Sequence, residues 1–236
     1  AKAAAIAGLL RAAGPEEVVP VTGWLAGEPR QGRLGVGWRT LSRLGGGTAA
    51  APSLTVAAVD SALTDLGGTS GAGSAARRDA VLGGLLDAAT PEEQQFLVRL
   101  LTGELRQGAL EGVVLDAVAA AAEVPAPVVR RAFMLSGRLP ETAALALSGG
   151  VDALAGVRLE VGRPVRPMLA SPGSSLDAAL ADLGADVTVE FKLDGARIQV
   201  HRDGDVVRVW TRSLREVTDG VPELVERVRA LPCDTA

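Results

Sequence analysis

The chain has 236 residues, which is enough for one large domain or two ordinary domains with hydrophobic cores. Its net charge of −4 argues against binding nucleic acid through bulk charge, its single cysteine excludes an intrachain disulfide, and no stretch predicts a membrane span. Aromatic residues make up only 3% of the chain, so the cores have to be built from Ala, Val and Leu.

Residues 1–50 are predicted to form short helices separated by glycines. The first helix, Ala3–Ala12, is expected to end at Gly14-Pro15. Arginines then alternate with glycines at Arg30, Gly32, Arg33, Gly35, Gly37, Arg39 and Arg43. This segment is either a solvated connection or a glycine-spaced backbone that approaches phosphates, and the sequence alone favours neither interpretation.

Residues 53–149 are predicted to be a series of amphipathic helices. Ser53 is expected to cap the first of them, and Thr90 is expected to cap the third, with a Pro and a Glu at the favoured positions after it. The fourth is apolar nearly all round and is therefore expected to be central. The predicted helices are Leu54–Leu66, Ala75–Ala89, Pro91–Leu101, Leu110–Ala122 and Pro127–Leu135.

Three arginines in this part of the chain are candidates for binding anions. Arg130 and Arg131 are expected on the exposed side of the last predicted helix. Arg106 lies in a charged turn, Gly103–Gly108, between a helix end and a helix start, where backbone amides and the guanidinium would together attract an anion. The alternative is an ordinary helix connection with one solvated arginine.

The remainder of the chain is predicted to mix extended segments, helices and a hairpin. Residues 150–172 are expected to be extended, and Asp203-Gly204 is a strong signal for a tight hairpin turn. His201 is expected on the hairpin surface rather than in a metal site, because the chain has no second histidine. The predicted elements are a helix Leu176–Leu183, strands Val187–Phe191, Ile198–His201 and Val206–Trp210, and a helix Val221–Leu231.

Lys192 stands out because the chain has only two lysines against twenty-two arginines. An arginine stays protonated, whereas a lysine amine loses its proton when it is desolvated or lies beside other cations. The neutral amine is a nucleophile. A surface lysine beside the Asp194-Gly195 turn is the simpler alternative.

The residues around Lys192 form a longer pattern, Glu190-Phe191-Lys192-Leu193-Asp194-Gly195-Ala196-Arg197, followed after one hairpin by Thr211-Arg212. This pattern resembles motifs I and Ia of the covalent nucleotidyltransferases, which comprise ATP-dependent DNA ligases, RNA ligases and capping enzymes. The resemblance implies that Lys192 attacks the α-phosphate of ATP and carries AMP. It also implies that Glu190 reads the adenine, that Arg197 lies by the ribose and the nick, and that Arg212 contacts the ribose or the DNA phosphate. Mg²⁺ is expected to offset the triphosphate charge.

Two further sequence segments narrow the resemblance to one branch of these enzymes. The turn Gly103–Gly108 resembles one in the helical DNA-binding domain that precedes the core of bacterial-type ATP-dependent DNA ligases, and Arg166–Ala170 resembles the entry to that core. RNA ligases and capping enzymes lack the helical domain. The expected fold is therefore multidomain, α then α+β. It comprises an all-α DNA-binding domain at 1–159, carrying Arg106, Arg130 and Arg131, and the start of an antiparallel-sheet, ATP-grasp-like adenylation domain at 160–236.

The resemblance implies an ATP-dependent DNA ligase, of which this chain is the N-terminal portion. Such an enzyme seals nicked duplex DNA through lysyl-AMP and DNA-adenylate intermediates, in DNA repair, replication or recombination. We expect a cytoplasmic monomer without membrane contact, no metal ligands among these residues, and no nick sealing by this portion alone. The alternatives are a non-catalytic helical DNA-binding module and an RNA ligase. The sequence leaves open the pathway, the nick preference and the oligomeric state.

Overall fold

The computed structural model describes residues 1–44, 46–105, 110–167, 173–184, 186–191 and 194–235. The chain divides into two compact units, one formed by Ala1–Ala132 with Arg138–Gly156 and the other by Phe133–Gly137 with Val157–Ala236. We describe each unit by itself, and the predicted domain boundary at residue 159 stays a prediction. None of the described helices is long and apolar enough to cross a membrane.

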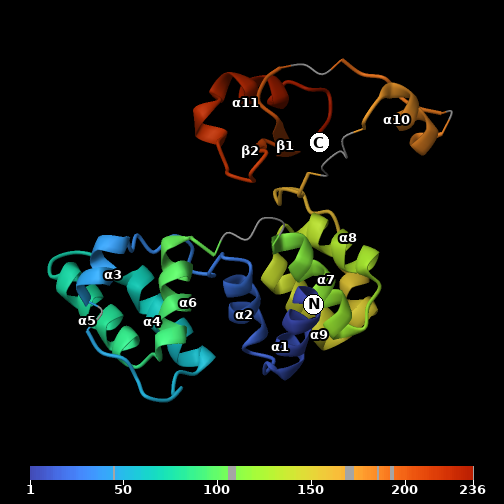
Figure 1. Ribbon diagram of the computed structural model, residues 1–236. Helices are drawn as coiled ribbons and strands as arrows, with labels where there is room; N and C mark the ends of the chain where they lie inside the picture. Colours follow the sequence, from blue (N-terminus) through green and yellow to red (C-terminus); the bar gives the residue numbers. More distant parts are fainter. Residues whose placement is uncertain (45, 106–109, 168–172, 185, 192–193, 236) are drawn as a thin grey trace. The chain divides into compact units, whose positions relative to one another are not determined.

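The described residues of the first unit form helices joined by loops, without a strand (Figure 1). The predicted helices are present with ends shifted by at most two residues, and α7 has the predicted ends. Residues 1–50 contain three short helices, as expected. The bounds are α1 Lys2–Ala12, α2 Val18–Leu25, α3 Trp38–Leu44, α4 Val56–Gly68, α5 Ser74–Asp87, α6 Pro91–Thr102, α7 Leu110–Ala122, α8 Ala126–Ser136 and α9 Leu139–Ala155.

Two apolar clusters stabilise the helical unit. Helix α7 is central as predicted, because it contacts both α1 and α9 and because the side chains of Val114 and Val118 are completely buried. The second cluster is formed mainly by leucines from α3 to α6, and Trp24 of α2 joins it. Leucine, valine and alanine dominate both clusters, as the scarcity of aromatic residues requires.

Local capping signals were correct for α6 and wrong for α4. The Thr90 hydroxyl accepts a hydrogen bond from the Glu93 amide at 3.3 Å, and the Glu93 carboxylate accepts one from the Thr90 amide at 2.8 Å. For α4, the cap is Thr55 and not Ser53, because the helix begins at Val56. Ser53 lies two residues before the cap position, and its hydroxyl donates instead to the Ala88 carbonyl at 3.4 Å.

The prediction that residues 150–172 are extended is wrong for the first residues of this range. Helix α9 continues through the Gly149-Gly150 pair to Ala155, with Gly150 alone in a non-helical conformation (φ 58°, ψ −142°). The helix resumes after this kink because Leu154 is completely buried, so the segment gains apolar burial by returning to the core. A glycine pair therefore bends this helix instead of ending it.

The second unit contains a hairpin and three helical segments (Figure 1). Strands β1 (Ile198–Asp203) and β2 (Val206–Thr211) pair antiparallel from Ile198–Thr211 to Asp203–Val206. The turn has Gly204 at φ 57°, as the Asp-Gly signal predicts. The helical segments are α10 Leu176–Leu183, η1 Thr218–Gly220 and α11 Pro222–Arg229.

The predicted strand at 187–191 is wrong: these residues are extended but belong to no strand, and the sheet of the described residues has only β1 and β2. The side chains of Val189 and Phe191 are 87% and 96% exposed. The β-forming composition of this segment is present, but a strand also needs a neighbour that accepts its hydrogen bonds.

Both faces of the hairpin are covered. On one face, Val200, Val207 and Val209 pack against Val225 and Val228 of α11, which confirms the predicted inward face of that helix. On the opposite face, Gln199 and His201 bond to residues 162–165. The coarse fold is thus a helical part and a small antiparallel sheet, as predicted.

A buried arginine joins the hairpin to α11. The Arg202 side chain is 7% exposed, and its guanidinium donates to the carbonyls of Gly204 (2.8 Å), Val228 (3.1 Å) and Leu231 (2.8 Å). The last carbonyls of a helix have no partner within the helix. Arg202 supplies one for α11 and fixes this helix over the end of the hairpin.

Candidate functional site

The Lys192 segment is described only in part. Lys192 itself and Leu193 lie outside the described residues, so the predicted nucleophile stays a prediction. On either side, Glu190, Asp194 and Arg197 are all exposed. The segment therefore presents its polar side chains to solvent, where a substrate could reach them.

The strand register brings two of the predicted residues to the same end of the hairpin. Ile198 pairs with Thr211, so Arg197 directly precedes one strand and Arg212 directly follows the other, at the end opposite the Gly204 turn. Both arginines are exposed. Two guanidiniums at one end of a rigid element are suited to binding phosphate oxygens.

The turn that carries Arg212 is held by several hydrogen bonds. The Thr211 amide donates to the Arg215 carbonyl at 2.9 Å, and the Thr211 and Ser213 hydroxyls lie 3.1 Å apart. Leu214 has φ 63°, a conformation that is uncommon for residues other than glycine. Such conformations persist only where the surrounding structure holds them, so the backbone on which Arg212 sits is fixed.

Residues 162–166 run across the hairpin face that is opposite α11. The Gly162 amide donates to Nδ1 of His201 at 2.9 Å, and the side-chain amide of Gln199 bonds to both the amide and the carbonyl of Val165. Arg166 donates from its amide to the Met134 carbonyl at 2.9 Å and lies over the Phe133 ring at 4.8 Å. The expected extended conformation is wrong for residues 161–163, which form a turn with Gly162 at φ 88° and a hydrogen bond of 3.1 Å from the Arg163 amide to the Glu160 carbonyl. Met168, Leu169 and Ala170 lie outside the described residues.

His201 is half-buried and not simply a surface residue of the hairpin, which corrects the prediction in part. Its ring meets the Trp210 ring edge-on at 4.7 Å between centroids, and burial lowers the pKa of His201 below its ordinary value. The described residues contain no group of three metal-ligating side chains, and the expectation that His201 binds no metal stays a prediction. Its role in the structure is to accept the Gly162 hydrogen bond.

The three arginines predicted to bind DNA are not brought together in the described residues. Arg106 lies outside them. Arg130 and Arg131 are exposed on α8 as predicted, and Arg130 forms an ion pair with Asp116 of α7 at 2.5 Å. This pair is about half exposed on both sides, so it contributes little to stability and can open at low cost.

The arginines of the arginine- and glycine-rich segment, residues 30–43, are of two kinds. Arg30 donates to Asp60, and Gln31 adds a further bond at 2.8 Å. Burial tends to raise the pKa of Asp60, but the hydrogen bonds from Arg30 and Gln31 outweigh it and hold this pKa below its ordinary value. Arg43 pairs with Asp79 at 2.7 Å. All four arginines are exposed, but Arg30 and Arg43 connect elements of the helical unit through ion pairs, whereas Arg33 and Arg39 form none with the described residues.

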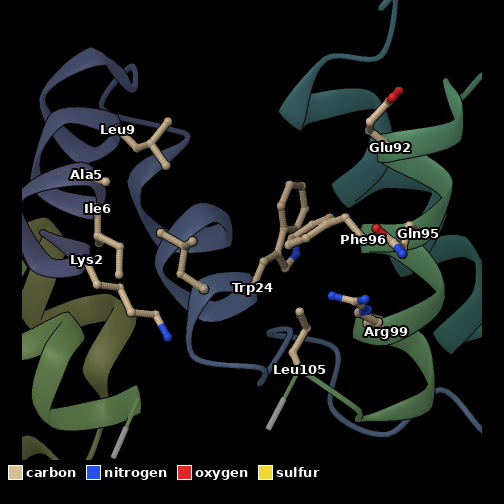
Figure 2. Close-up of a pocket in the computed structure, with 11 residues that line it drawn as sticks. Lys2, Ala5, Ile6, Leu9, Trp24, Glu92, Gln95, Phe96, Arg99 and Leu105 are labelled. Atoms are coloured by element: carbon tan, nitrogen blue, oxygen red, sulfur yellow. The ribbon is translucent and has the colours of Figure 1, made fainter. Parts of the chain in front are cut away.

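A pocket of about 290 Å³ lies between α1, α2 and α6 (Figure 2). Ile6, Trp24 and Phe96 form its apolar part, and Arg99 lies beside them. The Nε1 of Trp24 is buried without a hydrogen-bond partner among the described residues. None of the residues predicted to bind ATP or DNA lines this pocket.

Comparisons with known proteins match both parts of the chain. Residues 42–119 match the family model described as "DNA ligase N terminus", and residues 167–235 match "ATP dependent DNA ligase domain". Together the two matches cover more than half of the chain, in the order helical part first. The chain belongs to the ATP-dependent DNA ligase family.

Curated members of the ligase family are similar over nearly the whole chain. A probable DNA ligase of Saccharopolyspora erythraea is 64% identical over 98% of the chain, and one of Rhodococcus jostii is 62% identical over 94%. One of Mycobacterium marinum is 52% identical over 98% of the chain. The chain covers 44% to 46% of the length of these relatives, so it spans less than half of each.

Proposed function

We propose that the protein containing this chain seals nicks in duplex DNA with ATP, and that residues 160–236 begin its adenylation domain. The observation that carries the proposal is the pattern from Glu190 to Arg197, which lies inside the match to the ATP-dependent DNA ligase domain. The order of a helical part before this pattern supports a DNA ligase over an RNA ligase. The ATP-grasp-like form of the complete domain and the boundary near residue 159 are parts of the same proposal.

In the first step, the neutral Nζ of Lys192 attacks the α-phosphorus of ATP. A nitrogen–phosphorus bond forms, the bond from the α-phosphorus to the bridging oxygen breaks, and pyrophosphate leaves. The amine has to lose its proton before the attack. Cations beside a lysine favour this loss. Arg197 and Arg212 would bind the phosphate oxygens.

In the later steps, AMP passes from Lys192 to the 5′-phosphate at the nick. The 3′-hydroxyl then attacks that phosphate, so the DNA backbone closes and AMP leaves. Glu190 would accept hydrogen bonds from the adenine. Arg106, Arg130 and Arg131 of the helical unit would bind DNA phosphates, which positions the duplex without reading its sequence.

Mg²⁺ is the ion expected to accompany ATP in this reaction, where it would offset phosphate charge. The described residues do not fit it, because they contain no group of three ligating side chains. We therefore assign no step to the ion. The work of this chain in the proposal is to supply the nucleophile and the guanidiniums.

The test is covalent labelling with ATP that carries a radioactive α-phosphate, in a protein of the relatives' length that contains this chain. Lys192→Arg should abolish the label while leaving the circular dichroism spectrum unchanged, because arginine keeps the charge but does not deprotonate. Lys2→Arg is the matched control, since it makes the same change at the other lysine and should label normally. Labelling of the Lys192→Arg protein would show that another group is the nucleophile. An unmodified protein that never takes label would leave the non-catalytic DNA-binding alternative.

A further inference from the structure

Residues 33–39 of the helical unit expose two arginines and a tryptophan side by side in the sequence. Arg33 and Arg39 are exposed, and the Trp38 side chain is 64% exposed. An exposed tryptophan presents a large apolar ring with a polar N–H, and this residue type is enriched at interfaces. We call Arg33, Trp38 and Arg39 the Trp38 patch.

The patch lies on backbone that the core holds in place. Leu34 and Val36, which alternate with exposed glycines, are each 7% exposed and belong to the leucine-rich cluster. The guanidinium of Arg78 on α5 donates to the carbonyls of Leu34 and Leu66. The segment is therefore an anchored part of the unit and not a loose connection, which decides between the two interpretations that the sequence left open.

The four arginines of this segment differ in what they contact. Arg30 and Arg43 are neutralised by Asp60 and Asp79. For Arg33 and Arg39, the described residues provide no ion pair and no hydrogen bond from the guanidinium. Residues 29–59 also contain no acidic residue at all. The patch thus carries two positive charges that nothing within its own stretch of chain offsets.

We propose that the Trp38 patch is a DNA-backbone contact, in which Arg33 and Arg39 bind two phosphates and the Trp38 ring packs on the deoxyribose between them. This proposal rests on the proposed function and adds a site that is separate from Arg106, Arg130 and Arg131. Two exposed cations and an exposed apolar ring within seven residues suit a DNA strand, where anionic phosphates alternate with apolar sugar faces. A contact of this kind carries no base code, which suits an enzyme that acts at nicks of any sequence.

The arginine contacts and the Trp38 contact predict a different dependence of DNA affinity on salt concentration. Each phosphate contact contributes about 0.9 to the slope of log affinity against log salt for duplex DNA. Replacing both arginines should therefore lower the slope by about 1.8. Raising the salt from 50 to 200 mM would then reduce the DNA affinity of the variant by a factor about twelvefold smaller than for the unmodified chain. Trp38→Ala should weaken binding roughly fivefold at every salt concentration, as expected from about 40 Å² of apolar contact.

The experiment measures fluorescence anisotropy of a labelled, singly nicked duplex with the 236-residue chain over a salt series. The double variant Arg33→Gln with Arg39→Gln is compared with the control Arg30→Gln with Arg43→Gln, which removes the same charge from the same segment but only from arginines bound to aspartates. We expect the first pair to lower the slope by about 1.8 and the control to lower it by less than half as much. Circular dichroism establishes that both variants are folded.

Equal slopes for the two double variants would overturn the proposal, because bulk charge would then explain the effect. An unmodified chain that binds nicked duplex, together with an unchanged slope in Arg33→Gln with Arg39→Gln, would overturn the patch and leave the proposed function standing. An unmodified chain that fails to bind at 50 mM salt would also overturn the patch, whereas the labelling test in the longer protein decides the proposed function separately. Tighter, patch-dependent binding of an RNA duplex would overturn the assignment to DNA.

Discussion

Replacing Arg202 with alanine should destabilise the hairpin unit through the loss of its three hydrogen bonds. The guanidinium is buried and donates to the carbonyls of Gly204, Val228 and Leu231. At about 1 kcal/mol net for each bond, the loss is about 3 kcal/mol. This is a large share of the 5–15 kcal/mol that stabilises a typical domain.

Hydrogen exchange measured peptide by peptide is the assay, because it reports on each unit separately. Amides in β2 and α11 should exchange about 150-fold faster in Arg202→Ala, which corresponds to 3 kcal/mol of opening free energy, while amides in α7 should not change. Arg202→Lys should fall between the two, since lysine keeps the charge but cannot reach three carbonyls at once.

Arg208→Ala is the matched control for Arg202→Ala. Arg208 lies on the same hairpin, directly opposite His201 in the register, but its side chain is exposed. Its removal should change exchange in β2 and α11 less than fivefold, an effect typical of surface substitutions. If the two alanine variants exchange alike, Arg202 contributes no more than any surface arginine and the argument from its hydrogen bonds is wrong.

Three other predictions concern the residues that hold the candidate sites. Burial lowers the pKa of His201, so the stability that comes from the neutral ring should be complete above pH 6.5, the ordinary pKa of histidine, and should decline as the pH falls below that value. Urea midpoints measured at pH 7.5 and 5.5 should show this decline. The decline should be smaller in His201→Gln. An identical decline in His201→Gln would assign it to other groups. Gln199→Ala should release residues 162–166, seen as faster exchange of the Val165 amide with β2 unchanged, and equal protection would contradict this. Asp116→Asn should free Arg130 and tighten binding to nicked duplex severalfold at low salt, whereas unchanged affinity would remove Arg130 from the proposed DNA contacts.

Features that depend on a few adjacent residues could be predicted from the sequence. The α6 cap needs only Thr90 and Glu93, and the hairpin turn needs only Asp203-Gly204, so both were found. The pattern around Lys192 is also local, and it led to the family that the comparisons then showed. In each case the physical cause lies within a few residues of the signal.

Features that depend on partners distant in the sequence could not be predicted. The β-forming segment 187–191 is extended without belonging to a strand, and nothing in its composition reveals whether a neighbouring strand is present. Arg30 and Arg39 look alike in the sequence, yet only Arg30 meets an aspartate, thirty residues away. The absence of acidic residues from 29–59 was a visible signal for the Trp38 patch, but its meaning depends on which arginines the fold neutralises.

The covering of the hairpin on both faces has a consequence for how substitutions in it would behave in cells. Residues that bury the sheet, such as Val209 and Gln199, lie between its ends, whereas Arg197 and Arg212 lie at one end. A substitution within the covered part would lower the population of folded protein without altering the two arginines that are proposed to meet the substrate. Such changes would appear as temperature-sensitive loss of protein abundance, with normal activity per folded molecule at lower temperature.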